Sequence, residues 1–355
     1  GRARPRPGRD GGPLSGGGAH AVDGGMTVDG IDTETRLATG ASAVTVDLTA
    51  VIVAVAADTP RVLTVRPPTA GADALPWGPL APEHATLQAG LRAWVERQTR
   101  LRLGYVEQLY TFGDRDRVHA GGEPGGGDRN ISVAYLALVD DAAPVGVTDA
   151  AWRDWYAHLP WEDGRDGVPP ARTAIVEHLR GWAERGDTPA ERRQRRERVR
   201  LTFGGGHRDA PAWDEERALE RYELLYEAGL VPEAWQDAGR TVPAWVAELP
   251  GTPMAADHRR ILATAIARLR AKIKYRPVLF ELLPPTFTLL DLQRTAEALS
   301  GVRLHKQNFR RLVMRQNLVE PTGEVAPDTG GRPARLMRFR PDVLLERPAP
   351  GVRVT

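Results

Sequence analysis

The sequence predicts a mixed α/β sandwich, a helical insertion and a C-terminal winged helix-turn-helix domain, which together make an α/β plus α+β architecture. Strand-like runs and one amphipathic helix alternate between residues 44 and 139. Two helix patterns joined by a glycine-containing turn, and then two short apolar runs, lie between residues 286 and 339. A chain of 355 residues has room for two or three domains.

Composition and charge exclude several classes of protein. The formal net charge is only +2 although the isoelectric point is about 9.0, so the basic residues are regional and a histone-like polycation is excluded. With 0 cysteines there is no disulfide framework, thiolate nucleophile or zinc finger, and any metal would need carboxylates or histidines. No apolar run reaches the roughly 18 residues of a membrane span, and the N-terminal stretch lacks a signal-peptide core, so we expect a soluble, cytoplasmic protein.

The first part of the chain differs in composition from the rest. Residues 1–35 are rich in Gly, Pro and Arg and have almost no bulky apolar side chains, so burial cannot offset the entropy lost on ordering. We predict a disordered N-terminal arm, with Met26 as a candidate natural start. A DNA contact by this basic arm is an alternative.

The sandwich is predicted element by element. Residues 44–55 and 61–66 predict a hairpin joined by a turn at Asp58, Thr59 and Pro60. A helix follows at 86–100, and strands at 106–112 and 131–139 flank a glycine-rich loop at 113–129. The apolar side of that helix is expected to carry Leu87, Leu91, Trp94 and Val95.

The middle of the chain predicts helices. Residues 213–228 form an amphipathic pattern, and the side chains expected to point inward are Leu219, Tyr222, Leu225 and Tyr226. The arginine-rich run at 191–200 is expected to be a solvated helix face, with nucleic-acid contact as the alternative. We interpret Asp257 as the N-cap of the next helix, with His258 in its first turn, in preference to a catalytic dyad.

The first helix of the winged helix begins after a proline break. Either Thr286 or Thr288 can cap it, and Gly301 stops it. Its apolar residues recur at helical spacing, and they are Leu289, Leu292, Ala296 and Leu299. The pattern therefore predicts a short helix with one buried face.

The second helix begins near His305 and turns Phe309, Leu312 and Val313 inward. Apolar runs at 318–319 and 336–339, joined by a Gly- and Pro-bearing loop, predict a wing. Outward side chains on this helix and the wing can bond base edges and phosphates. An isolated basic face is usually only solvated, but helix, turn, basic helix and basic wing together favour double-stranded DNA as the partner. The expected contacts are Lys306, Gln307, Asn308, Arg310, Arg311, Arg332 and Arg335.

Several motifs resemble one known family, the Nudix-related transcriptional regulators of NAD metabolism. LPWG at 75–78, EQLYTFGD at 107–114 and ISVAYLALV at 131–139 are similar to the Nudix-like domain of that family. The segments similar to its closing helix and winged helix are 257–275, 281–293, KQNFRR at 306–311 and 331–339. The interruption between these two groups resembles the long branch of these regulators, known from alphaproteobacteria.

The resemblance implies a domain organisation and a function. The expected parts are a disordered arm at 1–35, a Nudix-like sensor domain at 40–150, a Trp-rich helical insertion at 151–253, a closing helix and linker at 254–276 and a winged helix domain at 277–345. The family controls genes of NAD biosynthesis or salvage, so we expect a repressor that senses an adenine nucleotide such as ADP-ribose, NAD or ATP. No cofactor is required in this interpretation.

A Nudix enzyme needs carboxylates on one helix face to hold Mg²⁺ on a diphosphate. A box that starts at Gly78 places His84 at the first glutamate and Ala93 at the second. The box ends in a pair of glutamates that bind the metal. Glu96 occupies the first of these two positions, whereas Arg97 places a positive charge at the second. We therefore expect no efficient hydrolysis.

Nucleotide binding can outlast the loss of metal ligands, because strands and loops around the cleft also recognise the ligand. Arginines suit a diphosphate and an aromatic ring can stack on adenine. The candidates are Arg66, Trp77, Gln108, Phe112, Arg115 and Arg129. Trp77 and Phe112 could equally be core residues, and Arg115 could pair with a neighbouring aspartate.

Two alternatives and one assembly prediction complete the interpretation. The runner-up is an active Nudix-type nucleoside-diphosphate-linked hydrolase with a nucleic-acid-binding tail. The other alternative, a purely structural interaction protein, would leave the basic helix unexplained. The glycine clusters at 121–127 and 204–206 do not predict a phosphate-binding loop, because they lack the Gly-Lys-Ser/Thr ending of that motif.

Because one winged helix buries little surface on DNA, we expect a homodimer on an approximately palindromic operator.

Overall fold

The computed structural model describes residues 44–67, 71–114, 129–140, 149–204, 213–326, 333–346 and 351–352. The predictions that lie outside these residues are the disordered arm, most of the glycine-rich loop at 113–129, Arg115, Arg332 and the side chain of Arg129. None of the described helices combines the length and the apolar character that a membrane crossing needs.

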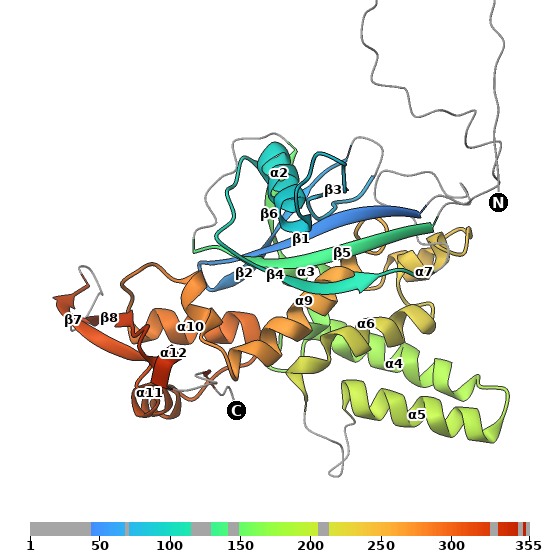
Figure 1. The fold of residues 1–355 in the computed structure, drawn as a ribbon. Helices are drawn as coiled ribbons and strands as arrows, with labels where there is room; N and C mark the ends of the chain where they lie inside the picture. Colours follow the sequence, from blue (N-terminus) through green and yellow to red (C-terminus); the bar gives the residue numbers. More distant parts are fainter. Residues whose placement is uncertain are drawn as a thin grey trace, which may run out of the picture. The chain divides into compact units, whose positions relative to one another are not determined.

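The sheet is mixed, as predicted, and it has six strands (Figure 1). Its strands are β1 (Val44–Ala56), β2 (Thr59–Val65), β3 (Trp77–Pro79), β4 (Tyr105–Phe112), β5 (Arg129–Leu138) and β6 (Ala150–Asp154). The order across the sheet is β4-β5-β1-β2-β6, and β3 pairs with β1. β1 and β5 run parallel, while the other pairs run antiparallel.

Three details of the sheet differ from the sequence prediction. The hairpin turn is formed by Ala57 and Asp58, with φ of 48° and 60°, and Pro60 already belongs to β2. Positive φ at both central positions is typical of a type I′ turn, which a proline cannot adopt, so Pro60 stands beside the turn and not within it. The structure also adds β3, and β6 turns the start of the predicted helical insertion into an edge strand paired with β2.

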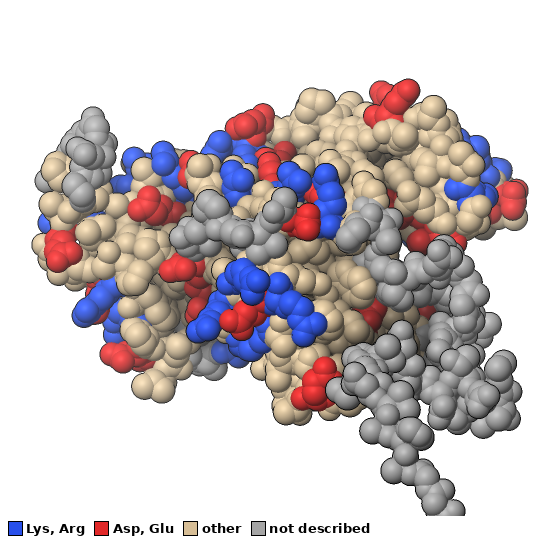
Figure 2. All heavy atoms as spheres, turned by 90° about the horizontal axis from the view of Figure 1, so that it is seen from above, with Lys and Arg blue, Asp and Glu red and all other residues tan. Residues whose placement is uncertain are grey.

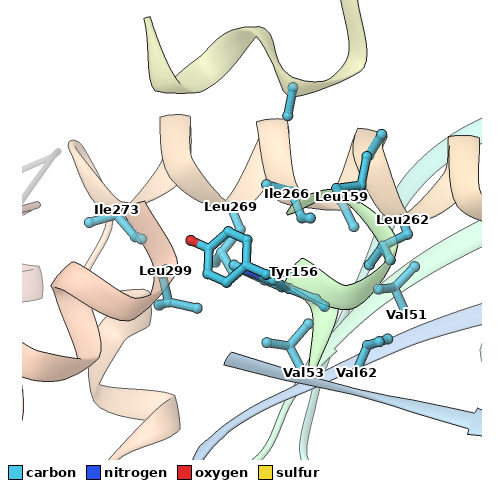
Figure 3. Packing of buried hydrophobic residues seen from close by; sticks show 14 of the residues in the cluster. Val51, Val53, Val62, Tyr156, Leu159, Leu262, Ile266, Leu269, Ile273 and Leu299 are labelled. Atoms are coloured by element: carbon cyan, nitrogen blue, oxygen red, sulfur yellow. The ribbon is translucent and has the colours of Figure 1, made fainter. Parts of the chain in front are cut away.

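Helices cover both faces of the sheet, and they are α2 (Leu87–Thr99) and α9 (His258–Ile273). Ile52 packs with Leu91 of α2 on one face. On the other face Val51 and Val53 pack with Leu262 of α9 (Figure 3). β1 is therefore buried on both sides, which explains its almost continuous apolar sequence.

Helix α2 begins as predicted, because the Thr86 hydroxyl accepts the N–H of Ala89 at 3.0 Å. Trp94 was expected on the apolar side of this helix, but it does not join the core. It lies half-buried at the side of the helix, where its indole N–H donates to the carbonyl oxygen of Pro79 at 2.8 Å. A tryptophan at the rim of an apolar face can keep its polar nitrogen bonded in this way.

The insertion is helical after β6 and packs on the α9 side of the sheet (Figure 1). Its elements are α3 (Trp155–His158), η1 (Pro160–Glu162), α4 (Pro170–Glu184), α5 (Pro189–Phe203), η2 (Glu215–Arg217), α6 (Ala218–Glu227), α7 (Pro232–Gln236) and α8 (Ala244–Ala247). In α6, Tyr222 and Leu225 are buried as predicted. Leu219 is half-buried and Tyr226 is exposed, because α6 instead turns Arg221 inward.

The C-terminal part has the predicted order of helix, turn, helix and wing. Its elements are η3 (Val278–Leu282), α10 (Leu289–Ser300), α11 (Lys306–Arg315), β7 (Val319–Val325), β8 (Arg335–Phe339) and an additional short helix, α12 (Val343–Glu346). Thr288 and Asp291 form a capping box at the start of α10, and Gly301 ends it with a left-handed φ of 71°. Asp257 occupies the N-cap position of α9, as predicted, but its side chain does not make the capping hydrogen bond to that helix.

Candidate nucleic-acid interface and ligand site

The two helices of the helix-turn-helix are joined by a short turn that Glu297 holds. Its carboxylate accepts Gln293 Nε2 at 2.8 Å, the Leu304 N–H at 3.0 Å and Arg303 Nη1 at 3.1 Å. Burial acts to raise the pKa of Glu297, but these three donors outweigh it and hold the pKa below its usual value. The charged carboxylate therefore fixes the start of α11 relative to α10.

Helix α11 buries Phe309 and Val313 against the domain and leaves its opposite face open. The exposed side chains on that face include Lys306, Gln307, Asn308 and Arg311. Asn308 Oδ1 accepts a hydrogen bond from Arg311 at 3.3 Å. The sequence predicted these exposed positions from the helical periodicity of buried and exposed residues.

Arg310 differs from the outward position predicted for it. Its side chain is half-buried, and its Nε is buried without a hydrogen-bond partner among the residues that the structure describes. It stands next to buried Phe309 at the edge of the apolar face, so only part of its guanidinium is accessible. Arg311 is the more exposed of the two arginines.

The wing is attached to the start of α10. Phe287 and Met337 exchange backbone hydrogen bonds of 3.0 and 2.8 Å, and the rings of Phe280 and Phe339 stack at 4.4 Å. On its surface Arg338 pairs with Glu320 at 2.7 Å. Exposed Arg335 has no such ion pair within the described range, so its charge faces solvent.

The predicted nucleotide-binding residues do not all lie together. Trp77 pairs with Thr49 across β3 and β1, and Phe112 pairs with Ser132 across β4 and β5, which places both rings on the α9 face at the same end of the sheet. Phe112 is buried and Trp77 half-buried. Gln108 points to the other face, because β4 changes register between Gln108 and Tyr110.

A row of polar side chains lies between those two aromatic residues, and the sequence analysis missed it. Asp47 accepts Asn130 Nδ2 at 2.7 Å, and the hydroxyls of Thr49 and Ser132 are 2.9 Å apart. All four residues are buried. The signal was available in β1, where Asp47 and Thr49 lie on the face that continues as Val51, Val53 and Val55.

Arg66 reaches the same end of the sheet but is already paired. Its Nη2 donates to Asp73 at 2.9 Å, and Arg153 binds the other oxygen of Asp73 at 2.8 Å. The Arg66 side chain is 61% exposed, so the pair can exchange with another anion at small cost.

The face of α2 that would hold metal in a Nudix enzyme is open to solvent. Ala93, Glu96, Arg97 and Arg100 are exposed at helical spacing. Glu96 pairs with Arg102 at 3.1 Å, and the guanidinium of Arg97 lies 4.3 Å from the Trp94 ring centre. On the face viewed in Figure 2, Lys and Arg side chains are mixed with Asp and Glu. Within the described residues, no three His, Asp or Glu side chains come together as metal ligands.

One family of known domains and one curated relative match parts of this chain. The NrtR DNA-binding winged helix domain family matches residues 279–339. The "ADPR responsive transcriptional repressor NtrR" of Acinetobacter baylyi is 41% identical over 86 residues, which are 24% of this chain and 34% of that protein. The aligned region thus spans about a third of the relative's length.

Two solved structures are similar over most of the chain. Shewanella oneidensis NrtR complexed with a 27mer DNA is 20% identical with a TM-score of 0.49, and the match covers 84% of this chain and 94% of that chain. A MutT/nudix family protein from Enterococcus faecalis is 15% identical with a TM-score of 0.47, and the match covers 83% of this chain and 86% of that chain. With the helix, turn, helix and wing described above, the family match identifies residues 279–339 of this chain as an NrtR-type DNA-binding winged helix domain.

Proposed function

We propose that this chain is a transcriptional repressor that binds operator DNA and controls genes of NAD biosynthesis or salvage. The observation that carries the proposal is the exposed cationic and amide face of α11, within a domain that matches DNA-binding winged helices. Such helices enter the major groove with one face toward the bases. The choice of NAD genes rests on the sequence resemblance to regulators of NAD metabolism.

Each exposed side chain of α11 has a chemical role in this proposal. Gln307 and Asn308 carry a donor and an acceptor on one amide and can bond an adenine edge at two points. Lys306 and Arg311 supply cations for phosphates, as does Arg335 on the wing. Since Asn308 is bonded to Arg311 in the free protein, a base read by Asn308 releases Arg311 toward the backbone.

The proposed effector is an adenine nucleotide, and ADP-ribose is the first choice because the curated relative is named as ADPR responsive. We place it at the polar row between Trp77 and Phe112. An aromatic ring there can stack on the base, and the Asp47 carboxylate can accept ribose hydroxyls, as acidic residues do in other nucleotide sites. Arg66 and Arg129 are the proposed partners of the diphosphate.

In this proposal the effector is bound and not hydrolysed. The positions equivalent to the metal-binding pair carry Glu96 and Arg97, and Glu96 is tied to Arg102. A cation placed beside Arg97 would be repelled, so the Mg²⁺ that polarises a diphosphate has no suitable ligand set there.

One experiment separates the regulator from a hydrolase. A duplex selected from a random library by the wild-type protein is titrated with and without ADP-ribose, and the same ADP-ribose samples with Mg²⁺ are analysed for AMP. We expect tight binding to one selected sequence, a shift in affinity equivalent to about 1 to 3 kcal/mol of coupling, and no AMP. Production of AMP together with absence of a preferred duplex would support the hydrolase instead.

A further inference from the structure

The C-terminal end of α10 is held by side chains from outside the winged helix. Tyr156 Oη donates to the carbonyl oxygen of Ala298 at 2.8 Å, and Arg270 Nε donates to that of Leu299 at 2.9 Å. A helix leaves its last carbonyls without partners of its own, so a donor there fixes the position of the helix end. Tyr156 comes from α3 of the insertion, and Arg270 from α9.

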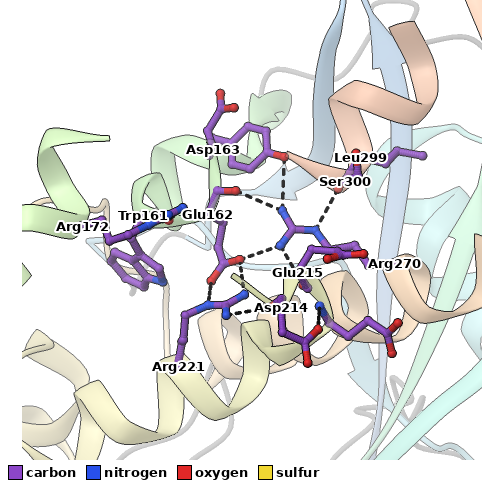
Figure 4. Close-up of polar contacts among 12 residues, drawn as sticks. Trp161, Glu162, Asp163, Arg172, Asp214, Glu215, Arg221, Arg270, Leu299 and Ser300 are labelled. Atoms are coloured by element: carbon purple, nitrogen blue, oxygen red, sulfur yellow. Dashed lines mark hydrogen bonds and ion pairs between the residues drawn. The ribbon is translucent and has the colours of Figure 1, made fainter. Parts of the chain in front are cut away.

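Both donors belong to a buried ionic group, the Glu162 cluster, which consists of Tyr156, Glu162, Arg221 and Arg270. Figure 4 labels Glu162, Arg221 and Arg270 of this cluster. Glu162 accepts Arg221 Nε and Nη2 at 2.5 and 2.8 Å, and Arg270 Nη1 at 2.6 Å. The side chains of Glu162, Arg221 and Arg270 are 0% exposed. Burial acts to raise the pKa of Glu162, but the two guanidiniums outweigh it and hold the pKa below its ordinary value.

The cluster contains two guanidiniums and one carboxylate, so it carries an excess of buried positive charge. The C-terminal end of a helix carries the partial negative charge of its carbonyls, and Arg270 is directed at that end of α10. If α10 moved away, Arg270 Nε and Tyr156 Oη would lose partners inside the protein, which is costly for buried donors. The cluster and the end of α10 therefore stabilise each other.

Gly301 brings the same end of α10 close to the insertion. Its carbonyl oxygen accepts the N–H of Gly164 at 2.8 Å. A Cβ at Gly301 would stand 2.4 Å from the carbonyl oxygen of Glu162 and 2.9 Å from Tyr156 Oη. The helix stop recognised in the sequence is thus also a place where the backbones of the two parts of the chain lie close together.

We propose that Tyr156, Glu162 and Arg270 are positioning residues of the DNA-binding domain. They hold the C-terminal end of α10 in one place, so the insertion fixes the orientation of α11 relative to the sheet. Three of the four cluster members come from the insertion, which assigns a role to a segment that the regulator function alone leaves without one. A second part of the proposal, that the effector signal reaches α11 through α9 and this cluster, rests on the proposed function.

The first test measures orientation and needs neither DNA nor effector. Because the chain has 0 cysteines, Gln88→Cys on α2 and Met314→Cys on α11 introduce a single pair of spin-label sites. Both native side chains are exposed. Pulsed electron spin resonance on the full chain should give one narrow distance distribution.

Tyr156→Phe removes only the hydroxyl and should broaden that distribution. Tyr222→Phe is the matched control, because Tyr222 is 1% exposed in the same insertion and lies beside Arg259 of α9. Glu162→Gln should broaden the distribution further, provided that its circular dichroism and melting show a folded chain; if it does not fold, Tyr156→Phe decides alone. A width equal to that of wild type in every folded cluster variant would overturn the proposal, as would equal broadening in Tyr222→Phe.

The second test concerns signal transfer. The ratio of DNA affinities with and without ADP-ribose is measured on the selected duplex, and in Tyr156→Phe it should fall roughly fivefold, the equilibrium effect of about one hydrogen bond. An unchanged ratio with a broadened distance distribution would keep the positioning role and reject the transfer. If the wild type itself shows no response to ADP-ribose, the proposed function fails while the distance measurement still decides the positioning.

Discussion

In the proposed function, the side chains of α11 divide into those that read bases and those that bind phosphates. We predict that Arg311→Ala weakens binding to all duplexes alike and lowers the slope of log affinity against log salt by about 1, whereas Gln307→Ala costs about 1 to 3 kcal/mol at one base pair. Fluorescence anisotropy with the selected duplex and single-base variants measures both. Arg193→Ala on α5 is the control, since Arg193 is also exposed; a loss there equal to that of Arg311→Ala would favour DNA contact by the insertion.

A second prediction at this scale concerns His158, which is buried in α3. Burial lowers its pKa below 6.5, and the nearby charge of Arg259 acts in the same direction. The unfolded chain therefore takes up this proton first, and the free energy of unfolding falls as the pH drops below 6.5, until the folded pKa is reached. The slope is at most about 1.4 kcal/mol per pH unit.

Urea unfolding between pH 7 and 5 checks this prediction, with His158→Gln as the comparison. The variant is expected to lose overall stability, because Nδ1 no longer bonds to the Thr252 carbonyl oxygen at 3.0 Å. Its curve should nevertheless be flatter over the same pH range. Parallel curves for the two proteins would mean that His158 does not carry the pH dependence.

Single residues also show how far the sequence could predict the sites. The exposed set on α11 follows from local helical periodicity, so it was predictable. The separation of Gln108 from Phe112 was not, because the register change in β4 depends on its pairing with β5. Glu162 and Arg270 are distant in the sequence, and nothing in either segment reveals that they meet.

At the scale of elements, Gly301 gives a prediction with a matched control. Gly239 has a similar φ of 63° but no atom within 4 Å of an added Cβ, so Gly239→Ala should cost only the left-handed backbone strain of about 1 kcal/mol. Gly301→Ala should cost about 1 to 3 kcal/mol more, because Cβ meets a backbone oxygen that must move. Urea unfolding of both variants measures the difference, and equal costs would show that the contact between Gly301 and Glu162 is loose.

Helix α2 carries the second prediction of this scale. Ala93→Glu with Arg97→Glu places three carboxylates on one exposed face together with Glu96. Since Mg²⁺ prefers oxygen ligands, calorimetry should detect Mg²⁺ binding to the variant in the presence of ADP-ribose and none to the wild type. Equal heats for the two proteins would contradict the view that this face has lost its metal site through these positions.

The sequence predicted an element well where the residues of that element alone determine it, and poorly where pairing with a distant strand does. α10 has its own cap, its own apolar repeat and its own glycine stop, so residues 288–301 suffice to define it. β3 has three residues and β6 has five, and both are strands only because β1 and β2 offer them hydrogen bonds. Short strands of this kind have no periodicity that a sequence could display.

For the whole molecule we predict a dimer on DNA. One winged helix covers a single half-site, and specific affinity in such regulators usually needs two half-sites about one helical turn apart. Light scattering of the protein with the selected duplex should give two chains per duplex, and the selected sequence should be approximately palindromic. A single chain on a site without symmetry would contradict this.

The position of α9 in the chain has a consequence for synthesis. Strands β1 and β2 are made early, yet Leu262 and Ile266, which pack on Val51, Val53 and Val62, follow the whole insertion (Figure 3). During translation the face of the sheet that α9 covers therefore lacks Leu262 and Ile266 until the ribosome has passed the whole insertion. Contacts so distant in sequence fold slowly and leave apolar surface exposed to aggregation. Newly made chains should consequently depend on chaperones until residue 273 has emerged, and truncation before α9 should yield insoluble protein.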